Sequence, residues 1–363
     1  MATIFPVRLS IASVFLTFFV DNLCWAMVFP IFAPYFVDPN NLLFSPSVLP
    51  STRIVILGFF LMAFPLGQFL GAPILGEYAD RHGRKKALGL SVFCTMMGVL
   101  LTAWSVKHHQ LPWLFIGRLM TGVFASSGSI CLACVTDLSE SDKEKVKNFG
   151  HLSLMAGFSF IVGAFVGGRL SDPTNSSSFS PSLPLWIASG LTGLNFLFVL
   201  FGFKETSQPD ATAGFHFFQS LHNIRKALQT KSIKRVYTVY FLFLFSWTLI
   251  FQFAPVIAVQ KYSFTSSNIG DMALFMGICW AIGSGYLNKL LARFFSPADV
   301  LKACLLAFMV CAALIVFLTG LADLILLIGL CAVIGGLGWP LCNGMISNLA
   351  TRDIQGKIMG MSQ

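Results

Sequence analysis

The chain has 363 residues, of which 56% are apolar and only 11% carry charge, and its mean hydropathy is +0.77. A soluble protein carries about 25% charged residues, so this composition excludes a water-soluble globular chain. The net charge of +9 does not indicate a nucleic-acid binder, because the basic residues lie in short segments between apolar stretches. We therefore expect an all-α polytopic membrane protein whose surroundings are the lipid bilayer.

Ten apolar stretches are long enough to cross a bilayer, which takes about 20 residues of helix. The first is apolar except for Asp21, and its length predicts a membrane span and not a cleaved signal peptide. In chain order we expect spans within 9–37, 54–76, 88–106, 119–136, 148–168, 173–203, 236–260, 272–288, 303–322 and 324–351.

Lys and Arg alternate between the two ends of these spans. With the N-terminus inside, the cytoplasmic segments hold 19 of them and the outer segments hold four, while Arg118 lies within the fourth span. Basic residues concentrate in cytoplasmic loops of membrane proteins. The pattern therefore predicts a cytoplasmic N-terminus and supports the number of spans.

The chain divides into two unequal parts. We expect a six-helix half at 1–203, a cytoplasmic linker at 204–235 and an incomplete C-terminal half, with helices 7 to 10, at 236–363. In the linker, apolar residues recur at helical spacing beside basic ones, which favours an amphipathic helix on the inner leaflet over a solvated linker. The two halves repeat each other weakly, since Pro30 and Pro255 begin similar tetrapeptides, and two related halves are a common transporter plan.

The segment 76–86 between the second and third spans carries the strongest motif, G-x-x-x-D-R-x-G-R-[RK]-K. Gly76 would let helices approach, and Gly83 permits a tight turn. Asp80 can accept hydrogen bonds from backbone N–H groups or pair with Arg84, and Arg81 is the motif's other fixed arginine. A loop that only orients the chain would not explain the spacing of Asp and Gly.

This segment resembles the signature loop of the major facilitator superfamily. Arg118 and Gly122 are similar to the R-x-x-x-G of that family's fourth helix, and Glu205 lies in a segment similar to the P-E-S/T that closes its sixth. Segment 355–360 resembles the loop before helix 11. The family has twelve spans, so the resemblance implies a chain that is truncated after helix 10.

Two further segments resemble the drug:proton antiporters of this family, which include the tetracycline exporters. Asp21, followed nine residues later by Pro30, is similar to their first helix. Gly163, Gly167 and Gly168 fit the glycines of the helix-5 motif G-P-x-x-G-G and can pack closely, but the proline of that motif is absent.

The resemblance implies a secondary active transporter that works by alternating access and exports a hydrophobic or amphipathic small molecule by proton coupling. It implies a monomer in a bacterial inner membrane, driven by the proton gradient and without a cofactor. The missing proline leaves open a proton-coupled metabolite importer, and the missing spans leave open a non-transporting remnant. No hydrolase, metalloprotease or nucleotide-binding motif indicates an enzyme.

Charges within the spans are candidates for proton or substrate coupling, because an ionisable group at mid-bilayer costs about 2.5–3.5 kcal/mol on insertion scales. These are Asp21, which can instead cap a helix or face water, and Arg118, which can instead reach the outer interface. Asp271 is expected to begin helix 8. We expect no metal site, and Cys131 and Cys134 to serve in packing.

Other polar and aromatic residues within the spans are candidates for lining a substrate cavity, with hydrogen bonding between helices as the alternative for the polar ones. They are Trp25, Gln68, Asn195, Trp247, Gln252, Trp339 and Asn343.

Overall fold

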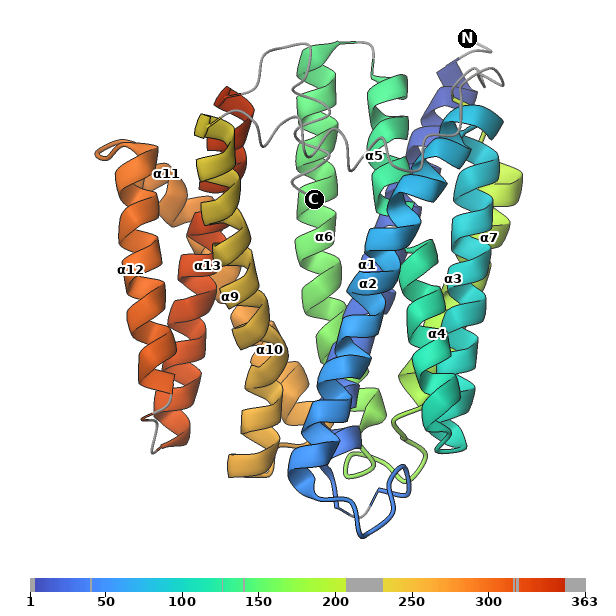
Figure 1. Cartoon of the computed structure of the whole chain (residues 1–363). Helices are drawn as coiled ribbons and strands as arrows, with labels where there is room; N and C mark the ends of the chain where they lie inside the picture. The colour runs from blue at the N-terminus through green and yellow to red at the C-terminus, as the bar shows by residue number, and fades with distance from the viewer. Residues whose placement is uncertain are drawn as a thin grey trace. The chain divides into compact units, whose positions relative to one another are not determined.

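The computed structural model describes residues 4–39, 41–125, 127–139, 141–206, 231–315, 317 and 320–349. Within these ranges the chain is helical and contains no strand, which confirms the all-α class (Figure 1). The helices are α1 (Ile4–Val37), α2 (Pro50–His82), α3 (Arg84–Lys107), α4 (Leu111–Phe124), α5 (Ser127–Leu138), α6 (Asp142–Ser171), α7 (Leu183–Gly202), α9 (Lys231–Tyr262), α10 (Ser266–Ala281), the π-helical turn η1 (Ile282–Leu287), α11 (Asn288–Leu291), α12 (Pro297–Ile315) and α13 (Leu321–Leu349).

Ten helical segments of the described chain are long and apolar enough to cross a membrane, which confirms the expected number of spans. The fourth combines α4 and α5, and the eighth combines α10, η1 and α11. Prolines occur inside four of the long helices, where neighbouring helices and local adjustments compensate for the lost hydrogen bond.

The helices extend beyond the charge-free stretches that predicted them. The fourth span begins at Leu111 and contains Arg118, and the eighth begins at Ser266. Asp271 therefore lies in the second turn of α10, and the expectation that it begins this helix is wrong. The physical reason is that long charged side chains can reach the interface or a partner while the helix backbone continues through them.

The chain forms two compact units. Unit 1 comprises Met1–Phe215 together with Val259–Asp271, and unit 2 comprises His216–Ala258 together with Met272–Gln363. The amphipathic helix predicted within the linker and the segment 355–360 lie outside the described residues.

In unit 1, α1 packs on α6 and α7, α3 packs on α4 and α7, and α2 packs on α4. Glycines permit these approaches. A Cβ atom at Gly122 of α4 would collide with the carbonyl oxygen of Phe64 in α2, and one at Gly163 of α6 would lie 2.5 Å from the carbonyl oxygen of Leu23 in α1. Small residues at such interfaces let backbones approach in the absence of a hydrophobic driving force between helices.

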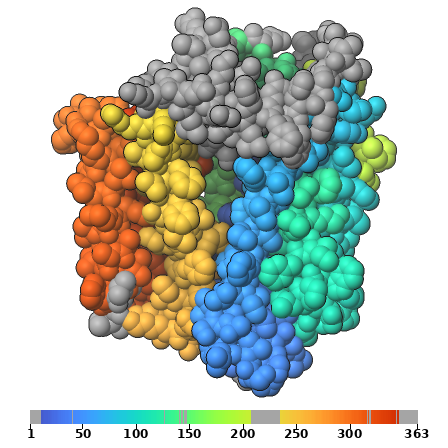
Figure 2. Space-filling model, in the orientation of Figure 1, coloured from blue at the N-terminus to red at the C-terminus, as the bar shows by residue number. Residues whose placement is uncertain are grey.

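In unit 2, α12 packs on α13, and η1 also packs on α13. Gly283 of η1 faces the backbone of Val333, so the π-helical turn lies where a side chain would prevent the contact. Both units expose large apolar side chains along their helices: Phe69 of α2 and Leu306 of α12 are each 62% exposed, and Figure 2 shows the surfaces of these two helices. Such surfaces suit a hydrocarbon environment.

Candidate functional site

Asp21 lies on the face of α1 that packs inside unit 1. Thr17, Asp21 and Cys24 are spaced four and three residues apart, so they share one side of the helix. The Ser127 side chain lies within hydrogen-bonding reach of the Asp21 carboxylate. The carboxylate oxygen Oδ2 of Asp21 is buried and has no hydrogen-bond partner among the described residues. The structure therefore places a buried, incompletely satisfied carboxylate within the first span.

The partner of Asp21 stands at an interruption of the fourth span. Helix α4 ends at Phe124, and Ser127 is the first residue of α5. The Asp21 carboxylate therefore lies at the N-terminal end of α5, where unpaired backbone N–H groups and the helix dipole favour a negative charge. This interruption was not expected from the sequence, although the run Ala-Ser-Ser-Gly-Ser at 125–129 is a signal that could have shown it.

Arg118 is 9% exposed and lies among the rings of three phenylalanines. Its guanidinium carbon is 4.7 Å from the ring centre of Phe64, 5.5 Å from that of Phe32 and 6.0 Å from that of Phe60. The rings stabilise the charge by cation–π attraction. Its Nε is buried without an acceptor, and no ion pair joins Arg118 to any carboxylate that the structure describes. The side chain is thus buried and does not reach the interface.

The remaining candidates of unit 1 make separate contacts. Asn195 is 2% exposed, and its Oδ1 accepts a hydrogen bond of 3.1 Å from Thr17, while its Nδ2 is buried without a described partner. Gln68 donates to the carbonyl oxygen of Ala125, beside the α4–α5 interruption, at 3.3 Å. Trp25 packs 5.9 Å from the ring of Phe160. Asn195 therefore bonds to α1, and Gln68 bonds to the residue that follows α4. Both contacts fit the alternative role of hydrogen bonding between helices.

In unit 2, the candidate tryptophans belong to one aromatic cluster. The rings of Trp247 and Trp280 are 4.9 Å apart, and those of Trp280 and Trp339 are 6.5 Å apart. Gly335 makes room, because a Cβ there would lie 2.7 Å from Trp280 and 3.0 Å from Trp247. Trp339 is 40% exposed, so the cluster offers an accessible aromatic surface. Trp280, which joins the two predicted rings, was not among the sequence candidates.

Gln252 is half-buried in α9. Asn343 belongs to α13, but its side chain falls outside the described part of the chain.

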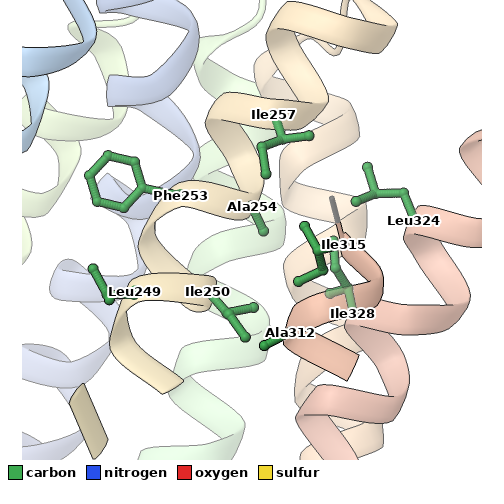
Figure 3. Close-up of a pocket in the computed structure, with 9 residues that line it drawn as sticks. All are labelled: Leu249, Ile250, Phe253, Ala254, Ile257, Ala312, Ile315, Leu324 and Ile328. Atoms are coloured by element: carbon green, nitrogen blue, oxygen red, sulfur yellow. The ribbon is translucent and has the colours of Figure 1, made fainter. Parts of the chain in front are cut away.

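Unit 2 also holds a pocket of about 320 Å³, shown in Figure 3. Its lining contains apolar side chains from α9, α12 and α13 and includes none of the predicted cavity residues. Ligand sites orient their ligands with a few placed polar groups, so this pocket suits an apolar chain that needs no orientation. The lining residues are Leu249, Ile250, Phe253, Ala254, Ile257, Ala312, Ile315, Leu324 and Ile328.

The signature segment forms the corner between α2 and α3. Gly83 ends α2 and precedes α3 with φ +94°, a backbone conformation that favours glycine. Arg84 Nη1 lies 2.7 Å from Asp80 Oδ1, which confirms the expected pair, and Arg84 Nε lies 3.3 Å from Asp137 Oδ2. Arg81 pairs with Glu77 at 3.5 Å. The arginines therefore tie this corner to α2 and α5.

Glu205, just beyond α7, completes this corner from the far end of the first half. Its carboxylate accepts the backbone N–H of Arg84 at 2.7 Å and that of Lys85 at 3.1 Å. It thereby satisfies two of the unpaired donors at the start of α3. A Cβ at Gly83 would collide with this carboxylate, so the glycine serves both the turn and the approach of Glu205.

Gly76 differs from the expectation. A Cβ at this position would meet no described atom within 4 Å, so the close helix approach expected there is not seen in the described chain. The closely packed positions of α2 are Gly67 and Gly71, whose Cβ atoms would meet the backbone of α4.

We expect Glu205→Gln to weaken the α2–α3 corner by about 1 kcal/mol, the usual effect of losing a capping acceptor. The amide keeps one acceptor but turns an NH₂ group toward two N–H donors. Hydrogen exchange at the amides of Arg84 and Lys85 is the measurement. Glu77→Gln removes a half-buried carboxylate that pairs with Arg81 within α2 and does not contact these amides, so it is the matched control, with exchange at these amides unchanged. Equal exchange in both variants would contradict the capping role.

Comparison with known proteins agrees with this arrangement. A family profile described as "Major Facilitator Superfamily" matches residues 14–363. The "Tetracycline resistance protein, class B" of Escherichia coli is 29% identical over 320 residues, covering 84% of this chain and 73% of that protein. The class H protein of Pasteurella multocida is 26% identical over 310 residues, covering 84% of this chain and 74% of that protein.

A solved structure shares the fold. The crystal structure of the human organic anion transporter MFSD10 superposes with a TM-score of 0.69 at 20% sequence identity, covering 98% of this chain and 89% of that chain.

Proposed function

The chain belongs to the major facilitator superfamily of membrane transporters, and we propose that it exports a small hydrophobic or amphipathic compound in exchange for protons. The observation that carries this proposal is the buried Asp21 carboxylate at the N-terminal end of α5. The tetracycline resistance proteins, which match most of this chain, support export as the direction.

Asp21 supplies a physical basis for coupling. Its ionised form is attracted by the Ser127 hydroxyl and by the positive end of the α5 dipole, and its protonated form loses this attraction. The two forms therefore favour different packing of α1 against α5. A ligand or proton that binds one packing better than another shifts the balance between them, which is the requirement for a coupled cycle.

The remaining features of this proposal concern the surroundings of the protein. We place the chain in a bacterial inner membrane with its N-terminus in the cytoplasm, as a monomer that uses the proton gradient as its energy source. The excess of Lys and Arg in the predicted cytoplasmic segments supports this orientation.

Arg118 favours a second candidate function, transport of a compound that carries an anionic group. The guanidinium is buried, lacks an ion pair in the described chain, and has no acceptor for its Nε among the described residues. A carboxylate on a substrate would supply both the acceptor and the opposite charge. Ala164 at the position of the helix-5 proline keeps a third candidate open, import by proton symport.

Transport by vesicles that contain the purified protein tests these candidates. We expect tetracycline, or a hydrophobic compound found in a strain that lacks its own efflux pumps, to move against its gradient when a pH gradient is imposed. An ionophore that collapses the pH gradient should stop this movement. Flux that does not respond to the ionophore would contradict proton coupling, preferential flux of anionic compounds would favour the second candidate, and co-directional proton movement would favour the third.

A further inference from the structure

A dense set of polar contacts in unit 1 has no part in the site described above. It joins the end of α6 and the turn after it to the segment Val259–Asp271, which comprises the end of α9, the α9–α10 loop and the start of α10. The positive-inside pattern assigns these helix ends to the outer side. We call this set the clasp, and it consists of Arg169, Asp172, Asn175, Ser267 and Asp271.

An ion pair forms one edge of the clasp. Arg169 Nη2 lies 2.9 Å from Asp271 Oδ1 and 3.0 Å from Oδ2, so one nitrogen faces both carboxylate oxygens. Both side chains are 44% exposed. Asn175 bridges the same surfaces, because its Nδ2 donates to Ser267 Oγ at 2.7 Å and to the carbonyl oxygen of Arg169 at 3.1 Å. The ion pair is partly exposed to solvent, and water competes with an exposed ion pair.

Asp172 forms the buried part of the clasp. It is 2% exposed, and its Oδ2 accepts the backbone N–H of Ser267 at 3.2 Å, at the start of α10. Burial alone would raise the pKa of Asp172, but hydrogen bonds from Thr265, Thr174 and Ser267 outweigh it and lower the pKa from its ordinary 3.8 to about 2. Because this folded-state pKa is lowered, its stabilisation is complete above pH 3.8 and is lost only as the pH falls toward about 2. Acidification of the outer medium within the physiological range leaves Asp172 ionised.

The backbones of α6 and α10 also touch beneath these side chains. A Cβ at Gly168 would lie 2.6 Å from the carbonyl oxygen of Ser266 and 3.0 Å from Cα of Gly270. Two glycines facing each other allow the helices to close without displacing side chains. The two backbones are therefore in close contact, while the polar side chains above them can exchange partners.

We propose that the clasp holds Val259–Asp271 against the end of α6 and opens once in every transport cycle. Both α9 and α10 continue from this segment into unit 2, so any movement that carries these helices away from α6 must break the clasp. This inference rests on the proposed transport function and adds to it named residues at the ends of α6, α9 and α10.

Cross-linking across the clasp tests whether it opens. In Asn175→Cys/Ser267→Cys, a short bifunctional thiol reagent should join the two positions and lower transport at least tenfold, and reduction of the link should restore it. Ser45→Cys/Ser47→Cys is the matched control, because those hydroxyls lie 3.0 Å apart within the exposed α1–α2 loop, and its cross-link should leave transport unchanged. The parental chain, with its nine native cysteines, gives the background. Equal transport by the cross-linked and reduced clasp variant would overturn the proposal.

A second measurement needs no substrate. Ser267→Cys, at a position that is 5% exposed, should react at least fivefold faster with a membrane-impermeant thiol reagent when Asp271→Asn is added, and the charge-reversed pair Arg169→Asp/Asp271→Arg should restore slow labelling. Adding Glu77→Gln instead should not change the rate. Unchanged labelling when Asp271→Asn is added would overturn the proposed clasp. Faster labelling in a protein that transports no compound would contradict the transport function, but it would still support the clasp contacts.

Discussion

Asp21→Asn is expected to reduce flux driven by a pH gradient to the level of vesicles without protein. Asparagine has nearly the same size and can still accept the Ser127 hydrogen bond, so packing of α1 against α5 should persist. It cannot gain or lose a proton at neutral pH, so the switch between the ionised and neutral forms disappears. The measurement is uptake or release of the test compound under an imposed pH gradient.

Exchange of labelled for unlabelled compound without a pH gradient separates coupling from binding. We expect Asp21→Asn to retain this exchange, because the substitution removes the proton and not the helices that move. Ser127→Ala is the matched control, since it removes the hydrogen bond and keeps the carboxyl group. Its transport should be slower but should still depend on the pH gradient, and pH-dependent transport that persists in Asp21→Asn would exclude Asp21 as the proton carrier.

The spans could be predicted from the sequence because hydropathy over about 20 residues is a local property. Their ends could not, since the charge-free stretch stops at Arg118 whereas the helix runs through it from Leu111. The same reasoning misplaced Asp271, which lies within α10 and pairs with Arg169 in α6. A pairing over 102 residues leaves no local pattern.

The site shows the same division between local and long-range information. A single carboxylate in an apolar stretch identifies Asp21. Ser127 cannot be identified in this way, because hydropathy predicts one continuous fourth span, whereas α5 begins at this residue. Only the resemblance points to Glu205. The backbone N–H groups that donate to its carboxylate, at the start of α3, lie 120 and 121 residues earlier in the chain. Trp280 was missed because aromatic residues are 14% of the chain and composition does not separate one ring from another.

The second large effect is expected at a glycine of α6, where this helix packs against α1. A Cβ at Gly167 would collide with the backbone of Met27 in α1, including its carbonyl oxygen. Backbone atoms cannot rotate away as a flexible side chain does, so Gly167→Ala must push α1 and α6 apart. Overpacking of a close interface costs about 1–3 kcal/mol, and α1, the helix that would be displaced, also carries Asp21. We therefore expect both a lower unfolding temperature in detergent and loss of proton-driven transport.

Gly157→Ala in the same helix is the matched control. A Cβ there would meet no described atom within 4 Å, so only the helix propensity changes, which favours alanine by about 1 kcal/mol. Its unfolding temperature should stay the same or rise, and transport should persist. An equal fall in both variants would mean that α6 needs glycine for its own backbone and not for its approach to α1. A fall in Gly167→Ala alone would show that the α1–α6 contact holds α1, the helix that carries Asp21, in place.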